Sequence, residues 1–385
     1  MFHILIISSW YPNQANPLAG IFVREQALAL HLRGLKVGVI GPTVFRPHLK
    51  TNTTKKTLPS VPFPELVPQL INWGFFIPGK LATVWEKNVT RLFSEYIATY
   101  GTPDIIHAHN MLYAGYAGMS LSKSYQIPLV LTEHHSRHFD NSFKFWQRGL
   151  VHRGLRQIDH GIAVSGHLKK AILSQVHCRS DKWTVVPNMV SDIFISRPIT
   201  NLPVENEFRF ITVGNLVPIK RQDLILKAIY QIKSECRLKV RLDIIGAGPE
   251  NQQLKELVKA FHLEEIVRFR GPLNREALLD ALDNSHALIS ASNFETFGLV
   301  ICEAHARGKP VISTQSGGPN EIINIENGQL IPVNDVNSLV RAMEDMMTNY
   351  SAYDGEKIHQ SAVNRFSPAK VTKQLLTYYE KILKN

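Results

Sequence analysis

A strand gives way to a helix within residues 294–304, which read Phe-Glu-Thr-Phe-Gly-Leu-Val-Ile-Cys-Glu-Ala. The apolar run at 287–290 has the length of a short strand. Helical apolar spacing begins at Gly298 and stops at Gly308, the residue type that most often follows a helix. Because the first N–H groups of a helix lack partners within it, this segment predicts a diphosphate site around Gly298.

Two carboxylates flank Gly298. Glu295 precedes the predicted helix, and Glu303 lies inside it, more than one turn further on. A carboxylate only accepts hydrogen bonds, so its natural partners in a ligand are sugar hydroxyls. The simpler alternative is an unrelated surface glutamate and helix glutamate. The glycine between the two carboxylates and the strand-to-helix position favour a single shared site.

Residues 295–314 combine Glu-x7-Glu with the run Gly-Lys-Pro-Val-Ile-Ser-Thr. This combination resembles the donor-site signature of the family-4 retaining glycosyltransferases, which have the GT-B fold. The resemblance extends nearly from end to end of the chain. Through Ser-Ser-Trp-Tyr-Pro at 8–12, it is similar to the branch that builds exopolysaccharide and lipopolysaccharide. It implies transfer of a sugar from a nucleotide-sugar donor with retention of anomeric configuration.

Length and composition suit a globular protein of two domains. The chain has 385 residues, of which 44% are hydrophobic and 19% charged. Its three cysteines, Cys178, Cys236 and Cys302, are far apart and show no metal-binding spacing. The first residues resemble a buried strand rather than a signal peptide, and no apolar run is long enough to span a membrane. We therefore expect the protein in the cytoplasm, either free or peripherally bound at the inner face of the membrane.

Positive charge is concentrated in the first half. Residues 1–200 contain 21 Lys and Arg against 10 Asp and Glu, whereas the remainder contains 22 of each kind. The first half also holds 12 of the 16 histidines. This asymmetry suggests an anionic partner, such as a membrane surface, a nucleic acid or a charged substrate. Solubility alone is the alternative explanation.

Strand and helix patterns alternate along both halves. Strands are expected over 4–7, 37–40, 105–107, 129–132, 162–164, 183–186, 208–213 and 287–290. This alternation predicts an α/β fold with parallel doubly wound sheets, in which ligands bind beyond the carboxyl ends of the strands. The resemblance implies a GT-B architecture, with two Rossmann-like domains facing a central cleft. We expect an acceptor domain over 1–200, a nucleotide-sugar domain over 201–365, and a C-terminal helix over 366–385 that crosses back to the first domain.

Three loops of the first half carry candidate acceptor residues. They contain Tyr11, His109 and His134, and the first of them also delivers Gly20 to the start of a helix. Residues 132–138 hold three histidines and a glutamate, which invites a metal hypothesis. Adjacent histidine side chains splay apart, however, and no HExxH motif is present, so we expect no metal. The resemblance implies that His134 points at the transferred sugar.

The segment between the strands at 37–40 and 105–107 is basic, apolar and rich in proline. We expect it to be irregular, because its prolines exclude one continuous helix. Trp73 and Phe76 lie near Lys80 and Lys87, a combination that suits a membrane interface. Packing of these aromatic side chains on the core is the alternative.

Cations follow the first strand of the second half. Lys220 and Arg221 lie where that strand gives way to a helix, a position suited to neutralising a diphosphate. The resembling family has a basic residue near position 215 and another at 220. Asn215 departs from that pattern, which leaves Lys220 as the main cation.

Glycines mark another loop of the second half. Gly246 and Gly248 lack the third glycine of a dinucleotide fingerprint and instead resemble the family's Gly-x-Gly-Pro turn near the nucleotide. The family holds the base through backbone groups at the strand end that contains Arg270 and Leu273 here. The expected donor-binding residues are Gly20, Asn215, Lys220, Arg221, Gly246, Gly248, Arg270, Leu273, Glu295, Phe297, Gly298, Leu299 and Glu303.

Together with these features, the resemblance implies a retaining hexosyltransferase in cell-surface polysaccharide synthesis. The donor would be a UDP- or GDP-sugar, the acceptor a lipid-linked saccharide, and the catalytic residues His134, Lys220 and Glu295. No Asp-x-Asp motif is present, so neither a metal nor another cofactor is required by the sequence. A GT-B nucleotide-sugar epimerase is the main alternative. A basic nucleic-acid or membrane-binding protein is a weaker one, since the basic residues are scattered and no nucleic-acid module is readable.

Overall fold

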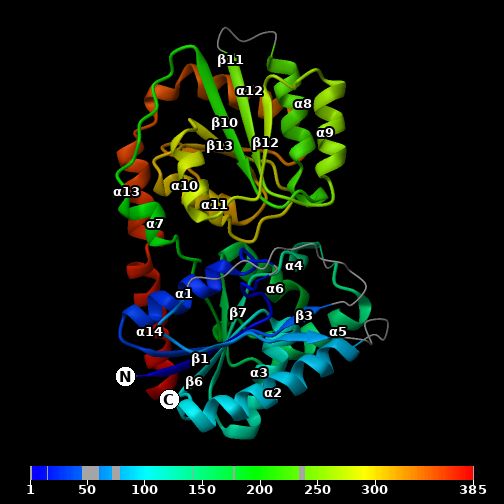
Figure 1. The fold of residues 1–385 in the computed structure, drawn as a ribbon, viewed down its shortest axis with the longest axis vertical. Coiled ribbons are helices and arrows are strands. Elements are labelled where there is room, and N and C mark those ends of the chain that lie inside the picture. Colours follow the sequence, from blue (N-terminus) through cyan, green and yellow to red (C-terminus); the bar gives the residue numbers. More distant parts are fainter. Residues whose placement is uncertain are drawn as a thin grey trace. The chain divides into compact units, whose positions relative to one another are not determined.

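The chain divides into two compact units in the computed structural model (Figure 1). Unit 1 comprises Met1–Asn188 and Pro368–Asn385, and unit 2 comprises Met189–Ser367. The structure describes residues 2–14, 16–45, 60–71, 79–140, 142–176, 178–233 and 239–384.

The segment 189–200 belongs to unit 2, although the sequence analysis assigned it to the first domain. Its backbone is held there by hydrogen bonds. The Val190 amide donates to Phe366 at 2.9 Å. The buried guanidinium of Arg307 donates to the carbonyls of Phe194 and Arg197 at 3.1 and 2.6 Å.

Unit 1 is built on a seven-stranded sheet of parallel strands in the order β4-β2-β1-β6-β7-β8-β9. The predicted strands of the first half are all present. The strands are β1 His3–Ser8, β2 Lys36–Ile40, β4 Glu65–Leu66, β6 Ile105–His109, β7 Leu129–Glu133, β8 His160–Ala163 and β9 Trp183–Val185, with β3 Thr43–Phe45 and β5 Gln69–Ile71 forming a separate pair. Every residue of β1 is buried, as expected for a central parallel strand covered on both faces.

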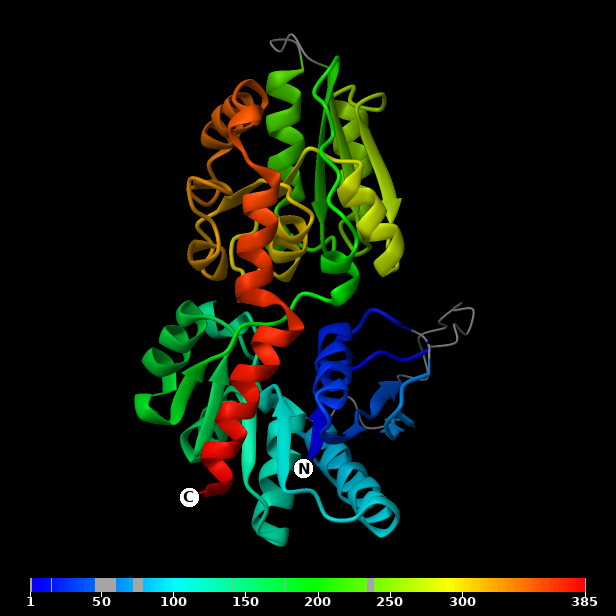
Figure 2. The same ribbon diagram turned by 90° about the vertical axis from the view of Figure 1, so that its left-hand side faces the viewer.

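The helices of unit 1 include the last helix of the chain. They are α1 Ile21–Leu32, α2 Lys80–Tyr100, α3 Tyr116–Tyr125, α4 Arg137–Asp140, α5 Phe145–Gln157, α6 Gly166–Val176 and α14 Pro368–Lys384. Helix α14, red in Figures 1 and 2, packs against α1 and buries Val371, Leu375 and Tyr379. Within the described ranges, no helix combines the length and the apolar character needed to cross a bilayer.

The segment expected to be irregular contains a long helix. Helix α2 buries Ala82, Trp85, Val89, Phe93 and Tyr96, whose spacing places them on one face. The expectation failed because seven prolines of this segment precede the helix and Pro103 follows it, so that none interrupts it. Residues 46–59 and 72–78, including Trp73 and Phe76, lie outside the described residues.

Unit 2 contains a six-stranded parallel sheet in the order β12-β11-β10-β13-β14-β15. Its strands are β10 Glu207–Val213, β11 Lys239–Ile245, β12 Val267–Gly271, β13 Ala287–Ser290, β14 Val311–Thr314 and β15 Gly328–Ile331. Its helices are α7 Asp192–Ser196, α8 Gln222–Ile232, α9 Asn251–Ala260, α10 Arg275–Asp283, α11 Leu299–Ala306, α12 Val336–Thr348 and α13 Gly355–Phe366.

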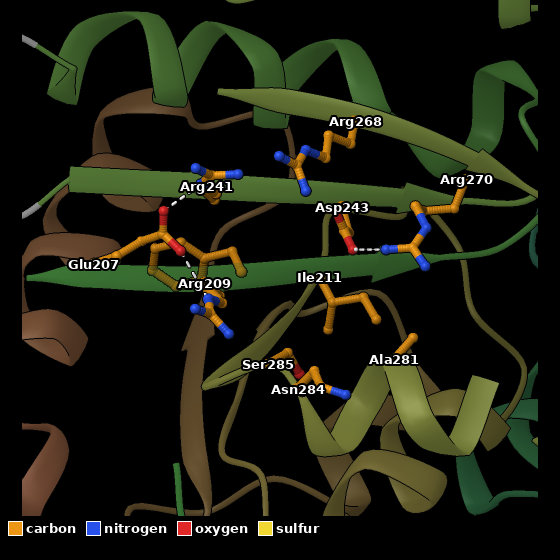
Figure 3. Close-up of a pocket in the computed structure, with 11 residues that line it drawn as sticks. Glu207, Arg209, Ile211, Arg241, Asp243, Arg268, Arg270, Ala281, Asn284 and Ser285 are labelled. Carbon is orange, nitrogen blue, oxygen red and sulfur yellow. Dashed lines mark hydrogen bonds and ion pairs between the residues drawn. The ribbon is translucent and has the colours of Figure 1, made fainter. Parts of the chain in front are cut away.

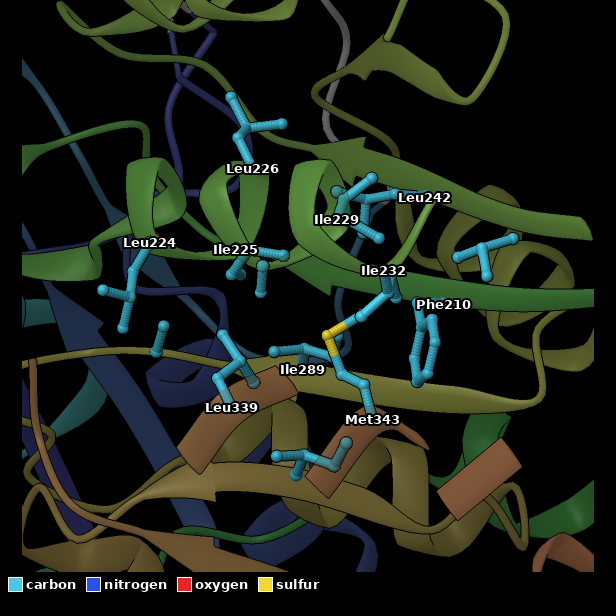
Figure 4. Packing of buried hydrophobic residues seen from close by; sticks show 14 of the residues in the cluster. Phe210, Leu224, Ile225, Leu226, Ile229, Ile232, Leu242, Ile289, Leu339 and Met343 are labelled. Carbon is cyan, nitrogen blue, oxygen red and sulfur yellow. The ribbon is translucent and has the colours of Figure 1, made fainter. Parts of the chain in front are cut away.

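One face of this sheet carries the core of unit 2 (Figure 4). Phe210, Leu242 and Ile289 project from three strands and pack with Ile229 of α8 and Met343 of α12. Burying a side chain of this size stabilises the fold by about 1.5–3 kcal/mol. The cluster therefore fixes the strands whose carboxyl ends carry the candidate donor loops.

Candidate active site

The strand-to-helix segment folds as its sequence predicts. Strand β13 ends at Ser290, and α11 begins at Leu299 directly after Gly298. Gly298 has a φ of 98°, in the left-handed region that favours glycine. The backbone of Glu295 is fixed by the loop after β14, since its amide donates to Ser316 and its carbonyl accepts from Gly318, both at 2.8 Å.

Lys220 and Glu295 meet at the carboxyl end of the unit 2 sheet. The Lys220 ammonium donates to Glu295 Oε2. The two side chains are 27% and 17% exposed, so the pair is only partly shielded from water. Lys220 comes from the loop after β10 and Glu295 from the loop after β13. Residues 75 positions apart, which were predicted separately, therefore lie together.

Arg221 is directed away from this pair. Its guanidinium donates to Asp223 at 2.8 and 3.1 Å. Asp223 also accepts from Lys227 on the next turn of α8. Among these cations, Lys220 is therefore the one whose side chain contacts Glu295. Asn215 is exposed, and its carbonyl accepts from Gln222 at 3.2 Å.

Glu303 forms an ion pair that sequence reasoning missed. Arg275, the first residue of α10, donates to Glu303 Oε1. The Glu303 side chain is only 3% exposed, and the Arg275 guanidinium also lies 5.2 Å from the Phe194 ring centroid. A cation in the first turn opposes the helix dipole, and that position is the sequence signal that could have suggested a separate partner for Arg275.

The other predicted donor residues differ in their surroundings. Gly246 must be glycine, because a Cβ there would lie 1.8 Å from the Gly214 carbonyl oxygen. Gly248 is packed in the same way against Leu216. Phe297 is buried, while Leu273 is partly buried. The Arg270 side chain lies on the face of the sheet near the end of β12, where it donates to Asp243 at 3.0 Å.

Buried imidazoles line the carboxyl ends of β6 and β7 in unit 1. His109 Nδ1 lies 2.9 Å from His134 Nε2, and the two rings are stacked with centroids 5.2 Å apart. His107 lies between the Tyr379 hydroxyl at 2.6 Å and the Thr132 hydroxyl at 2.7 Å. The last helix of the chain thus contributes to the network that supports the predicted acceptor histidines.

Glu133 anchors the loop that carries His134. Its carboxylate accepts hydrogen bonds of 2.9 Å from the amides of Met111, His134 and His135. Burial alone would raise the pKa of Glu133, but contacts with His138 and the Met111 amide lower it to about 2. The carboxylate is therefore ionised at neutral pH and holds the loop through its backbone.

The imidazoles themselves are neutral at pH 7. Burial lowers the pKa of His134 to about 4 and that of His107 to about 3. In the described part of the chain, the buried Nδ1 of His134 has no hydrogen-bond partner. An unpaired polar atom of this kind is costly, and a ligand hydroxyl could satisfy it.

Tyr11 and Gly20 are held by neighbouring residues. The buried Tyr11 hydroxyl donates to Glu65, which also accepts from Arg24 at 2.8 Å. Gly20 has a φ of 60°, and a Cβ there would lie 2.0 Å from the Trp10 carbonyl oxygen. Local packing therefore explains the glycine, and the Glu65–Arg24 pair was missed from the sequence.

Asn110 is a further residue that sequence reasoning missed. It has a φ of 68°, and its side chain accepts from the His134 amide at 3.2 Å. Non-glycine residues with positive φ are uncommon and often mark functional loops. Across the described ranges, no three His, Cys, Asp or Glu side chains gather as metal ligands.

Comparison with known proteins accounts for both units. Residues 19–192 match the family described as Glycosyltransferase Family 4, and residues 197–365 match Glycosyl transferases group 1. The structure is similar to that of HepE from Anabaena in complex with UDP and glucose, with a TM-score of 0.75 and 20% identity over 99% of this chain and 100% of that one. The two parallel-sheet units therefore define a GT-B fold. The chain belongs to family 4 of the glycosyltransferases.

The curated relatives match this chain over only part of their own length. The chain is 30% identical to N-acetyl-alpha-D-glucosaminyl L-malate synthase from Bacillus anthracis, over 61% of this chain and 63% of that protein. It is 25% identical to the phosphatidylinositol N-acetylglucosaminyltransferase GPI3 subunit from Saccharomyces cerevisiae, over 72% of this chain and 63% of that protein. The matches thus span less than two thirds of these relatives.

Proposed function

We propose that the protein transfers a hexose-type sugar from a nucleoside diphosphate sugar to a saccharide acceptor, with retention of configuration. The observation that carries this proposal is the Lys220–Glu295 pair beside the start of α11. A departing diphosphate needs cationic and N–H partners, and both are present here. When the diphosphate takes Lys220, Glu295 is released to accept hydrogen bonds from sugar hydroxyls.

In the proposed reaction, the bond between the anomeric carbon and the diphosphate oxygen breaks. Lys220 and the first amides of α11 stabilise the negative charge that builds on the diphosphate. The acceptor hydroxyl attacks from the face that the diphosphate leaves, and the leaving phosphate takes its proton. Glu295 orients the sugar throughout, so catalysis rests on positioning and electrostatics rather than on a side-chain acid and base.

Glu303 is proposed to bind the ribose of the donor. Its near-complete burial and its ion pair to Arg275 fix the direction of the carboxylate. Arg275 is then a positioning residue, because it acts on the ligand through Glu303. This assignment adds one residue to the donor set predicted from sequence.

His134 is proposed to contact the transferred sugar through its unpaired Nδ1. A neutral imidazole offers one donor and one acceptor, which matches a hydroxyl and does not add charge to the acceptor side. His109 fixes the orientation of His134 by stacking and by the 2.9 Å contact. The Tyr11 hydroxyl, already bound to Glu65, is the weaker acceptor candidate.

The finer identity of the substrates follows the relatives. We propose a UDP-sugar of the glucose or N-acetylglucosamine type, because the similar HepE structure holds UDP and glucose and both named relatives handle N-acetylglucosamine. A lipid-linked acceptor in cell-surface polysaccharide synthesis, reached from the inner face of the membrane, is supported by the positive charge of the first half of the chain.

The test is a donor panel on the full-length chain. Calorimetric titration should show tighter binding of UDP than of GDP. Labelled UDP-glucose or UDP-N-acetylglucosamine should release UDP when saccharide lipids are added. Conversion of the sugar to its epimer without acceptor would instead assign an epimerase. Failure of every nucleoside diphosphate to bind would overturn the proposed donor site.

A further inference from the structure

The unit 2 sheet has an arginine-rich face away from the donor loops (Figure 3). Arg209 of β10, Arg241 of β11, and Arg268 and Arg270 of β12 project from one side of three adjacent strands. The strand register places Arg209 beside Arg241 and Asp243 beside Arg268. The opposite side of the same strands is the apolar surface that packs in the core.

This face forms a pocket of about 300 Å³. Ile211 lies at its base, and Ala281, Asn284 and Ser285 at the end of α10 form one wall. Parallel sheets are normally covered on both faces by helices. Here the arginine-rich side of β11 and β12 borders a pocket instead.

The charges in the pocket do not balance. Glu207 accepts from both Arg209, at 2.7 Å, and Arg241. Asp243 accepts from Arg270 at 3.0 Å. Two carboxylates thus face four guanidinium groups, which leaves the lining with a net charge of +2.

Arg268 carries the unmatched charge. Its side chain is exposed, and no carboxylate of the described chain pairs with it. Burial raises the pKa of Glu207, but the hydrogen bonds from Arg209 and Arg241 lower it overall, so that carboxylate is already ionised and already used. The exposed guanidinium of Arg268, which water solvates, can therefore pair with an anion from solution without breaking an ion pair of the described chain.

We propose that this pocket binds a phosphomonoester, such as a sugar phosphate. Guanidinium groups match the oxygens of a phosphate in a fork, and several of them on rigid strands favour a dianion over a carboxylate. The volume is at the lower end for small-molecule sites, so it suits a phosphate with one ring and not a whole nucleotide-sugar. The site is separate from the donor loops, which lie beyond the carboxyl ends of these strands.

The simpler alternative is that the arginines only keep the sheet edge soluble. Strand β12 is an edge strand, and charged residues on it would discourage pairing with another chain. That role needs charge but no saturable binding. The two explanations therefore differ in a measurable way.

The experiment is calorimetric titration of the full chain with inorganic phosphate and with glucose 6-phosphate, in chloride buffer. We expect saturable binding that weakens at least tenfold in Arg268→Gln, a substitution that breaks no ion pair of the described chain. Arg341→Gln, which removes an exposed guanidinium from α12 in the same unit, is the matched control and should bind like the wild type. Thermal unfolding checks that both variants fold.

A second arm separates the pocket from the donor site. Lys220→Ala should retain phosphate binding. Loss of binding in that variant, equal binding in Arg268→Gln, or no saturable binding by the wild type would each overturn the proposal. Vesicles containing phosphatidic acid present the same phosphomonoester on a lipid. If the wild type binds these vesicles and Arg268→Gln does not, the phosphate belongs to a lipid headgroup. If the wild type binds glucose 6-phosphate but not the vesicles, the phosphate belongs to a soluble ester.

Discussion

Both units contain a parallel sheet, but the side chains at the carboxyl ends of the strands differ between them. In unit 1, neutral imidazoles are stacked and buried, with His107, His109 and His134 linked to hydroxyl groups and to one another. In unit 2, two ion pairs follow the strands instead, Lys220 with Glu295 in the loops and Arg275 of α10 with Glu303 of α11. A neutral site suits uncharged hydroxyls, and a charged site suits a diphosphate.

Net charge does not follow this division. Unit 1 contains 24 Lys and Arg against 10 Asp and Glu, a net charge of +14, whereas unit 2 contains 19 against 22, a net charge of −3. The unit proposed to bind the anionic donor is thus the acidic one. In the proposed donor site, the local placement of Lys220 rather than overall charge directs the diphosphate. The surplus charge on unit 1 then needs another explanation.

The largest expected difference between the units is their response to acid. The buried imidazoles of His107 and His134 and the half-buried imidazole of His135 have pKa values lowered by burial to between about 3 and 4, below the 6.5 of an unfolded histidine. Between these limits the unfolded chain binds more protons, so unit 1 loses stability as pH falls below 6.5. The loss is on the order of 2 kcal/mol per imidazole at pH 5.

Hydrogen exchange at pH 7 and pH 5, corrected for intrinsic rates, measures this loss. Amides of β6 and β7 should lose protection at pH 5, while those of β10 and β13 should change less. Unit 2 holds fewer imidazoles of this kind, of which His305 has its pKa lowered by burial to about 4. Glu133, with a pKa of about 2, adds a further loss in unit 1 below pH 4.5. An equal loss of amide protection in the two sheets would contradict the predicted difference in acid stability between the units.

Catalysis provides the next largest effect. Lys220→Ala should reduce the rate of sugar transfer by about 10²-fold or more, because it removes a cation from the proposed leaving diphosphate. Arg221→Ala is the matched control, since that guanidinium is paired with Asp223. Steady-state rates with saturating acceptor measure both. A larger loss in Arg221→Ala would mean that the wrong cation has been assigned.

Donor affinity should separate the two carboxylates of unit 2. Glu303→Ala should weaken donor binding by about 1.5–3 kcal/mol, the scale of a charged hydrogen bond. Glu295→Ala should reduce turnover more than it reduces affinity for the nucleoside diphosphate. Arg275→Gln should weaken donor binding less than Glu303→Ala does, because Arg275 acts through Glu303. Titration with the nucleoside diphosphate, together with rate measurements, distinguishes these outcomes. If Glu303→Ala binds the donor as tightly as the wild type, Glu303 is not part of the donor site.

The sequence was informative where one local pattern fixes one structure. Alternating apolar runs predicted both sheets, and Gly298 predicted the start of α11. Sequence reasoning failed where a structure depends on contacts between distant residues. Arg275 and Glu303 are 28 positions apart, and Glu65 reaches Arg24 and Tyr11 from a two-residue strand. Helix α2 was missed for a different reason. The prolines before it predicted an irregular segment, although the residues that follow them have the apolar spacing of a helix.

The smallest expected effect concerns the surplus charge of unit 1. Each Lys or Arg near an anionic membrane contributes about 1 kcal/mol of attraction, which salt screens. The exposed Lys80 and Lys87 of α2 belong to the basic segment that the sequence singles out. A lipid-linked acceptor at the inner leaflet would place such residues at the surface, and reversible binding would result without any anchor.

Sedimentation with vesicles tests this proposal. Vesicles rich in anionic lipid should bind the protein at low salt, less so as salt rises, and neutral vesicles should bind it less at every salt concentration. Lys80→Gln combined with Lys87→Gln should reduce binding, whereas Lys259→Gln combined with Lys357→Gln, which removes the same charge from exposed sites of unit 2, should leave it nearly unchanged. If the protein does not bind anionic vesicles even at low ionic strength, the positive charge of unit 1 only keeps the protein soluble. A soluble saccharide then becomes the better proposal for the acceptor, because nothing else in the described chain calls for a lipid.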